Sequence, residues 1–344
     1  MRKILFSITC LLILSAFASD DETMMAELPA FTEFKNKVDT PYSEMLAIHQ
    51  QLDAIEDDYQ AYFSNEQTPE ELQQQHTENL RDIRAKAEAL QHQVASIKAP
   101  EFRTESYKAK LPGLFAFLKE LSTHIDAHIA LVNAQYDAAL KEDGTAFDLI
   151  FAESVLHTAS LMRLENKMID GMNETLDREQ PQYPLNMAHI AANEATALHF
   201  EMSSFFRTEE LPNPQIFSDR LKIVQKEHLK WVRRASKLTK GLNKTNRAMK
   251  RSNKPLEKQL SQPFALIVKS YSRSLKSEMV LNNAIKLYSN QLRKMDNSSE
   301  TFTDIWVQFA GAFEGSYKST SDERTKESTI RMQEGVRFSN IYSQ

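Results

Sequence analysis

Histidines and carboxylates are the residues of this sequence whose types and spacing could support chemistry. His124 and His128 are four residues apart, and Glu153 and His157 repeat that spacing further along the chain. Residues four apart lie on one face of a helix, so each pair can present both side chains to one ligand. Two antiparallel helices with such pairs can build a metal site inside a helical bundle. The alternative, which we favour, is that these are ordinary histidines of the core or its boundary, because His128 also fits an apolar seam.

The sequence contains no catalytic motif that we recognise. It has neither the H-E-x-x-H pattern of zinc hydrolases nor the G-x-S-x-G turn of serine hydrolases. Only seven glycines occur, and no glycine-rich loop could cradle a phosphate. His189, Glu194 and His199 share one expected helix, but the ten residues between the histidines rotate them well apart. We therefore expect no enzyme activity, no cofactor and no metal.

The first eighteen residues have the order of a cleaved secretory signal peptide. Arg2 and Lys3 precede an apolar run, and Ala16-Phe17-Ala18 is typical of a cleavage site. The single cysteine, Cys10, lies in this segment, so the mature chain would have no disulfide and no cysteine metal site. Position 19 is serine, which argues against a lipoprotein. We expect a periplasmic or secreted bacterial protein, and no later run is apolar enough to span a membrane.

The composition predicts an all-α protein. Glycine is scarce, and no long run of β-branched residues bounded by turn residues occurs. Apolar residues recur at spacings of three and four, and Thr68-Pro69-Glu70-Glu71 is a strong helix start. The sequence therefore predicts an elongated bundle of about seven or eight long antiparallel amphipathic helices.

Charge and proline positions suggest how the chain is divided. A proline-rich hinge at 208–214 is the best candidate boundary, although a single extended bundle fits equally well. The expected segments are a signal peptide (1–18), a flexible acidic lead-in (19–38), an acidic helical bundle (39–211), a basic helical region packing on it (212–317) and a polar tail (318–344).

The near-neutral total charge hides two halves of opposite sign. Residues 19–219 contain 15 Lys and Arg against 36 Asp and Glu, whereas residues 220–344 contain 25 against 11. On one expected helix the cations recur every three or four positions, at Lys222, Lys226, Lys230, Arg233, Lys237, Lys240, Lys244, Arg247 and Arg251. Three explanations compete: a solvated helix face, an internal complement to the acidic half, or a surface that captures anions.

Several short motifs resemble those of the YiiG-like bacterial envelope proteins, a family of uncharacterised function. They are Pro41-Tyr42-Ser43-Glu44-Met45, Leu156-His157, Ile267-Val268-Lys269-Ser270-Tyr271 and Leu287-Tyr288-Ser289-Asn290. The resemblance covers about 40–295. It implies an export signal followed by a long helical domain, and it implies no catalytic residues. Members are usually lipoproteins, and the anchor cysteine is missing here.

These observations predict an exported, non-catalytic helical protein that binds a partner in the bacterial cell envelope, through the basic helix. The partner would be a protein or an anionic component such as a lipid headgroup or lipopolysaccharide. Nucleic acid is not expected, because of the compartment and because the stripe lacks interleaved aromatic residues. Long amphipathic helices also make a homodimer plausible. One alternative is a protective or inhibitory partner of a periplasmic toxin or hydrolase, docked through the acidic half. The other is a metal-binding helical bundle that uses His124, His128, Glu153 and His157.

Overall fold

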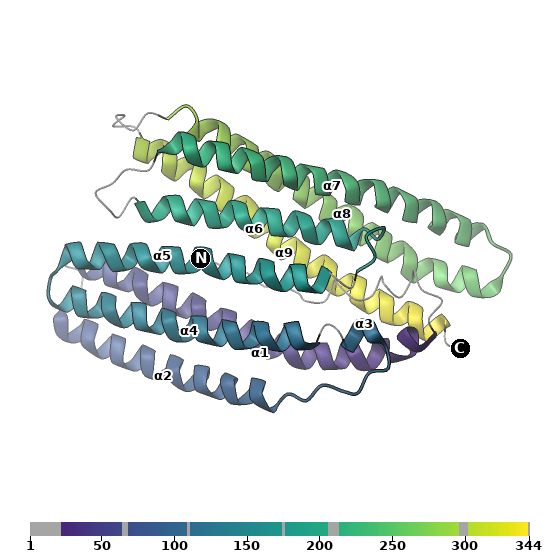
Figure 1. Cartoon of the computed structure of the whole chain (residues 1–344), viewed down its shortest axis with the longest axis horizontal. Helices are drawn as coiled ribbons and strands as arrows, with labels where there is room; N and C mark the ends of the chain where they lie inside the picture. Colours follow the sequence, from purple (N-terminus) through teal and green to yellow (C-terminus); the bar gives the residue numbers. More distant parts are fainter. Residues whose placement is uncertain are drawn as a thin grey trace.

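A computed structural model describes residues 22–63, 68–108, 111–173, 176–205, 213–295 and 302–342 of the chain (Figure 1). Within these ranges the secondary structure is helical, and the predicted all-α fold is confirmed. The helices are α1 (Glu22–Phe63), α2 (Pro69–Ser96), α3 (Glu105–Lys108), α4 (Leu111–Leu140), α5 (Gly144–Asn173), α6 (Gln182–Ser204), α7 (Pro214–Arg251), α8 (Pro255–Leu292) and α9 (Phe302–Tyr342). The predicted signal peptide (1–18) lies outside the described residues.

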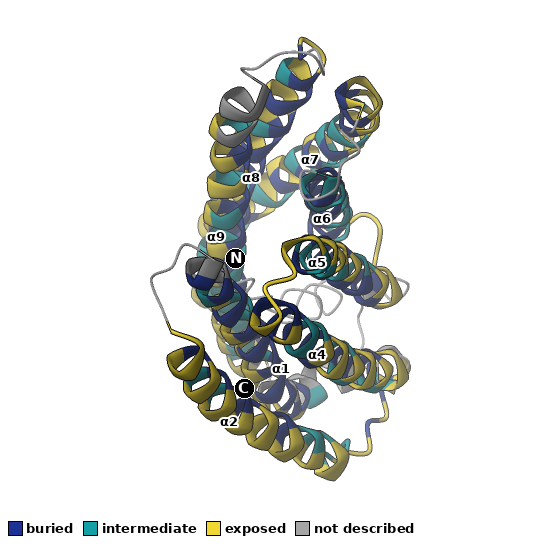
Figure 2. Cartoon of the chain, turned by 90° about the vertical axis from the view of Figure 1, so that its left-hand side faces the viewer, coloured by how far each residue is buried: buried dark blue, intermediate teal, exposed yellow. Residues whose placement is uncertain are grey.

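The long helices form two layers of an elongated bundle. Helices α4, α5, α6 and α7 follow one another in one layer, and α1, α9 and α8 form the other, with α2 at the end beside α1 and α4 (Figure 2). One hydrophobic cluster contains buried side chains from all eight long helices. The acidic and basic parts of the sequence therefore share a continuous core between the two layers.

Helix starts follow the local sequence signals. Thr68 caps α2 as predicted, because its hydroxyl accepts a hydrogen bond from the Glu71 backbone N–H while the Glu71 carboxylate accepts one from the Thr68 N–H. Asn213 caps α7 in a similar way, by accepting from the Gln215 N–H, and Pro214 occupies the first turn.

The expected flexible lead-in over 19–38 is instead helical from Glu22, where the described residues begin. Phe31 and Phe34 are buried there, and the Phe31 ring stacks on Tyr107 with 4.4 Å between ring centroids. Phe102 adds a second aromatic contact, with 5.3 Å between its ring centroid and that of Phe31. This burial offsets the two prolines that α1 contains, each of which removes a helical hydrogen bond.

The polar tail expected over 318–344 is also helical, since α9 continues to Tyr342. Several of its polar side chains are buried, and some of these contact α8. Arg331 donates to the hydroxyls of Ser270 and Ser274, at 2.9 and 3.0 Å, and Glu327 pairs with Arg273 at 2.6 Å. Hydrogen bonds and an ion pair to α8 therefore help to hold this polar segment against the core.

Candidate metal centre

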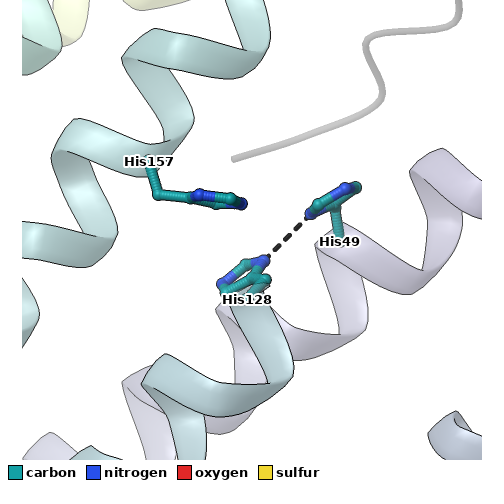
Figure 3. Close-up of side chains that lie close together, drawn as sticks. All are labelled: His49, His128 and His157. Carbon is teal, nitrogen blue, oxygen red and sulfur yellow. Dashed lines mark hydrogen bonds between the residues drawn. The ribbon is translucent and has the colours of Figure 1, made fainter. Parts of the chain in front are cut away.

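Three histidines from three helices meet between the two layers of the bundle. His49 of α1, His128 of α4 and His157 of α5 turn their rings toward one another (Figure 3). His49 and His128 are buried, and His157 is half-buried. The Nδ1 atoms of His49 and His128 are 3.0 Å apart, which is a hydrogen-bond distance. The centroid of the His157 ring lies 5.5 Å from that of His128 and 6.1 Å from that of His49.

The spacing of these rings suits a metal ion. Each histidine offers one ring nitrogen, and these nitrogens lie within 4.8 Å of one another. Tetrahedral zinc with bonds of about 2.0–2.1 Å holds its nitrogen ligands about 3.3 Å apart. Small side-chain rotations would therefore bring all three nitrogens into a first coordination shell.

The local helix positions explain why the rings converge. His49 follows the buried Ile48 on α1, His128 lies on the buried face of α4, and the neighbouring helices α1·α4 and α4·α5 pack directly. His124 lies one helical turn before His128 and also contacts His157. The Nδ1 atom of His124 is 3.4 Å from the Nε2 atom of His157. His157 Nε2 also lies 3.0 Å from the backbone oxygen of His124.

The sequence identified part of this cluster. It predicted that His124 and His128 share a face and can approach His157, and the structure brings these three histidines together. Glu153, the carboxylate expected beside them, is exposed. The nearby carboxylates instead belong to α1, whose contribution the sequence analysis missed. A usable signal was present there, because His49, Asp53 and Glu56 recur at spacings of four and three.

Two carboxylates face the second nitrogen of His128. Its Nε2 is 3.4 Å from Glu56 Oε1 and 3.8 Å from Asp53 Oδ1. Glu56 is buried and accepts hydrogen bonds from Gln135 Nε2 at 3.0 Å and from Ser154 Oγ at 2.5 Å. A carboxylate facing the far nitrogen of a metal-bound histidine fixes its tautomer and orients its ring. Glu56 is placed for this role.

Burial lowers the pKa of three histidines in this region, His49, His124 and His157. Burial, followed by the neighbouring histidines, holds the pKa of His49 well below its ordinary value. Burial, followed by His124 and His128, lowers the pKa of His157 to about 4. Burial also lowers the pKa of His124. Neutral imidazoles keep a lone pair for coordination, and a metal ion does not have to displace a proton at neutral pH.

Two other buried carboxylates, those of Glu278 and Glu165, have hydrogen-bond partners within the protein. Glu278 of α8 forms two hydrogen bonds with Arg324 of α9, at 2.6 and 2.9 Å, and a third contact with His228 of α7 at 3.0 Å. Glu165 of α5 accepts from Asn193 of α6 at 2.8 Å, and burial raises the pKa of Glu165 to about 7. These contacts join α7, α8 and α9, and separately α5 and α6, and we interpret them as structural.

The three residues expected to diverge on one helix do so. Glu194 pairs with Arg163 at 3.0 Å, whereas His199 lies in a separate environment with its Nδ1 2.8 Å from the Tyr288 hydroxyl. His189 is buried. These residues form no joint site.

The predicted basic stripe lies on one face of α7, and we call it the α7 stripe. Its members are Lys222, Lys226, Lys230, Arg233, Lys237, Lys240, Lys244, Arg247 and Arg251. All are exposed except the half-buried Lys222. Among the residues that the structure describes, Lys230 is the only member that forms an ion pair, with Glu227 of the same helix at 2.7 Å. The acidic half of the chain therefore does not neutralise the stripe within the described ranges.

Comparison of the chain with protein-family models, with curated proteins and with solved structures gives no match. The resemblance to the YiiG-like family stays a prediction. Within the described ranges, no helix combines the length and the hydrophobicity that a membrane span needs.

Proposed function

We propose that this protein binds a divalent transition-metal ion between α1, α4 and α5, with His49, His128 and His157 as its ligands. The observation that carries the proposal is the convergence of three ring nitrogens within 4.8 Å in the interior. One further nitrogen, Nε2 of His49, is buried without a hydrogen-bond partner in the described part of the chain. A buried polar atom without a hydrogen bond lowers the stability of a folded protein, so its presence here calls for a functional explanation.

The donor set indicates the class of ion. Imidazole nitrogens suit zinc, copper, nickel and iron, whereas magnesium and calcium prefer oxygen ligands. The single cysteine of the chain, Cys10, is far from this centre in sequence, and no thiolate is among its donors. The nearby Asp53 and Glu56 add negative charge close to a cation. We therefore expect a borderline divalent ion, and Zn²⁺ is the first one to test.

The test is metal binding by the untagged protein after dialysis against a chelator. Equilibrium dialysis with Zn²⁺, followed by elemental analysis, gives the stoichiometry and the affinity. We expect one ion per chain, and a loss of affinity of at least about 100-fold in His49→Gln and in His128→Gln.

The matched control is His92→Gln. His92 is exposed on α2, so its loss removes one histidine without touching the cluster. Unchanged Zn²⁺ affinity in the His49 and His128 variants, with folded circular dichroism spectra, would refute the proposal. Equal losses in all three variants would show adventitious binding and would refute it as well.

A second candidate function is the capture of an anionic partner by the α7 stripe. The observation that favours it is the exposure of eight of the nine cations, together with the absence of acidic partners from other helices among the residues that the structure describes. A row of unpaired cations raises the local concentration of anions. A protective role toward a basic protein, docked on the acidic half, is the competing hypothesis, and one stoichiometric basic protein retained at high salt would favour it.

We further propose that the protein works outside the cytoplasm and is not an enzyme. The support for export is the order of charged, apolar and small residues in 1–18. The support for a binding role is the absence of catalytic motifs from the sequence. Amino-terminal sequencing of the protein from an envelope fraction tests the first point, since we expect the mature chain to begin at Ser19.

A further inference from the structure

We infer that the α7 stripe docks this protein on a membrane surface rich in anionic phospholipid headgroups. The inference rests on the second candidate function, anion capture by α7, and specifies its partner. It depends on three features of the structure: the straightness of the stripe, its lack of ion pairs with other helices among the described residues, and its place in the molecule.

The nine cations form a narrow straight line. Successive residues of a helix are rotated by about 100°, so positions 222 to 251 of the stripe fall within an arc of about 100°. At about 1.5 Å per residue, Lys222 and Arg251 are about 44 Å apart along the helix axis. Helix α7 is unbroken from Pro214 to Arg251. All nine cations can therefore approach one flat surface at the same time.

Helix α7 separates its cations into two sets. Arg220 and Arg234 turn toward the acidic half and form ion pairs with Glu201 and Glu179, both at 3.1 Å. These two residues are not members of the stripe. The stripe itself keeps its charges toward the solvent, apart from the Lys230–Glu227 pair. Internal neutralisation thus uses other cations of the same helix.

The position of α7 favours a planar partner. Helix α7 ends one layer of the bundle, far from α2 and α1 at the other end (Figures 1 and 2). Residues 19–219, which include α1 to α6, have 36 acidic against 15 basic residues. An anionic surface would attract α7 and repel the opposite end, which orients the molecule. A globular acidic protein would curve away from a 44 Å row, whereas a bilayer presents phosphates along all of it.

The binding should be electrostatic and peripheral. The stripe positions themselves carry only Lys and Arg, so no side chain of the stripe is suited to insertion into the hydrocarbon region. Beside the stripe, Ile223 is the exposed apolar side chain, at 69%. Each Lys or Arg held near an anionic surface contributes about fivefold to the partition coefficient. Interactions of this kind weaken with salt, because the Debye length falls to about 10 Å at 0.1 M.

The experiment is sedimentation of the full chain with vesicles of phosphatidylglycerol and phosphatidylcholine, and with vesicles of phosphatidylcholine alone. The test variant replaces Arg233, Lys237, Lys240 and Lys244 by Gln. All four are exposed, and none forms an ion pair in the described structure. Lys230 is left in place because its Nζ pairs with Glu227 and lies 4.7 Å from the centroid of the Trp231 ring. Glutamine is a good helix former, so α7 should be retained.

A matched control removes the same charge from the acidic half. It replaces Lys98, Lys119, Lys141 and Lys167 by Gln, and these lysines are also exposed. We expect the wild type and the control variant to bind phosphatidylglycerol vesicles at low salt and to be released at high salt. The stripe variant should lose binding by about two to three orders of magnitude.

The outcomes separate the inference from the function on which it rests. One outcome would overturn the membrane inference and leave anion capture standing. In that outcome the wild type binds soluble inorganic polyphosphate or an acidic protein but not the vesicles, and the stripe variant loses this binding. Equal behaviour of the stripe and control variants toward every anionic probe would overturn both.

Discussion

Acidification should destabilise the metal-free protein through the histidine cluster. Burial lowers the pKa of His157 from 6.5 to about 4, so between these values the unfolded chain binds a proton that the folded chain does not. Stability therefore rises with pH in this window. The contribution of His157 is fully present above about pH 6.5, and it is lost as the pH falls toward about 4.

The size of the effect follows from the same shift. Each unit of pKa difference corresponds to about 1.4 kcal/mol, so a fully buried ring would contribute about 3 kcal/mol. His157 is only half-buried, and solvent screening reduces the expected value to about 2 kcal/mol. Burial shifts the pKa of His49 in the same direction. Acidification should therefore lower the free energy of unfolding by more than the contribution of His157 alone.

The assay is urea unfolding followed by circular dichroism at several pH values from about 7 to about 4, with a chelator present. The His157→Gln variant should lose about 2 kcal/mol less than the wild type over this range. The exposed His92→Gln variant should keep the slope of the wild type. Superimposable slopes for wild type and His157→Gln would refute the reasoning, because they would mean that the ring at 157 takes up its proton without a folding cost.

Three further variants test other parts of the structure. Glu56→Gln should lower Zn²⁺ affinity about 10- to 100-fold by disturbing the orientation of His128, as equilibrium dialysis would show; a normal affinity would contradict the positioning role. Arg324→Met should cost about 3–5 kcal/mol in urea unfolding because it leaves the Glu278 carboxylate buried without its main partner, and a cost below about 1 kcal/mol would count against the network. Glu165→Gln should stabilise the protein above about pH 7. The pKa of the Glu165 carboxyl is raised in the folded state, so the wild type loses stability as the pH rises from about 4.5 to about 7. Parallel pH profiles of the wild type and the variant in thermal melts would argue against this.

The features that were predicted correctly from the sequence depend on local signals. Thr68 and Glu71 lie three residues apart, and their capping box needs nothing from the rest of the chain. The spacing of the α7 cations likewise fixed their common face, because a helix repeats every 3.6 residues wherever it packs. These features depend on residues that are neighbours in sequence.

The missed features depend on residues that are far apart in sequence. Phe31 is buried by contacts with Phe102 and Tyr107, which a local reading of 19–38 cannot include. Arg331 can be buried because serine hydroxyl groups of α8 lie within hydrogen-bond distance of its guanidinium group. In the candidate centre, His49 and His128 are 79 residues apart, so their contact follows from the packing of α1 on α4 and not from any motif.

The sequence separation of the three histidines determines when the candidate metal centre can form during folding. A chain emerging amino-terminus first supplies His49 early, but the donor set stays incomplete until residue 157 and the rest of α5 have folded back on α1 and α4. Helices α6 to α9 supply none of the three ligands. Loading with metal would thus report that α1, α4 and α5 have packed together, independently of the half that carries the α7 stripe.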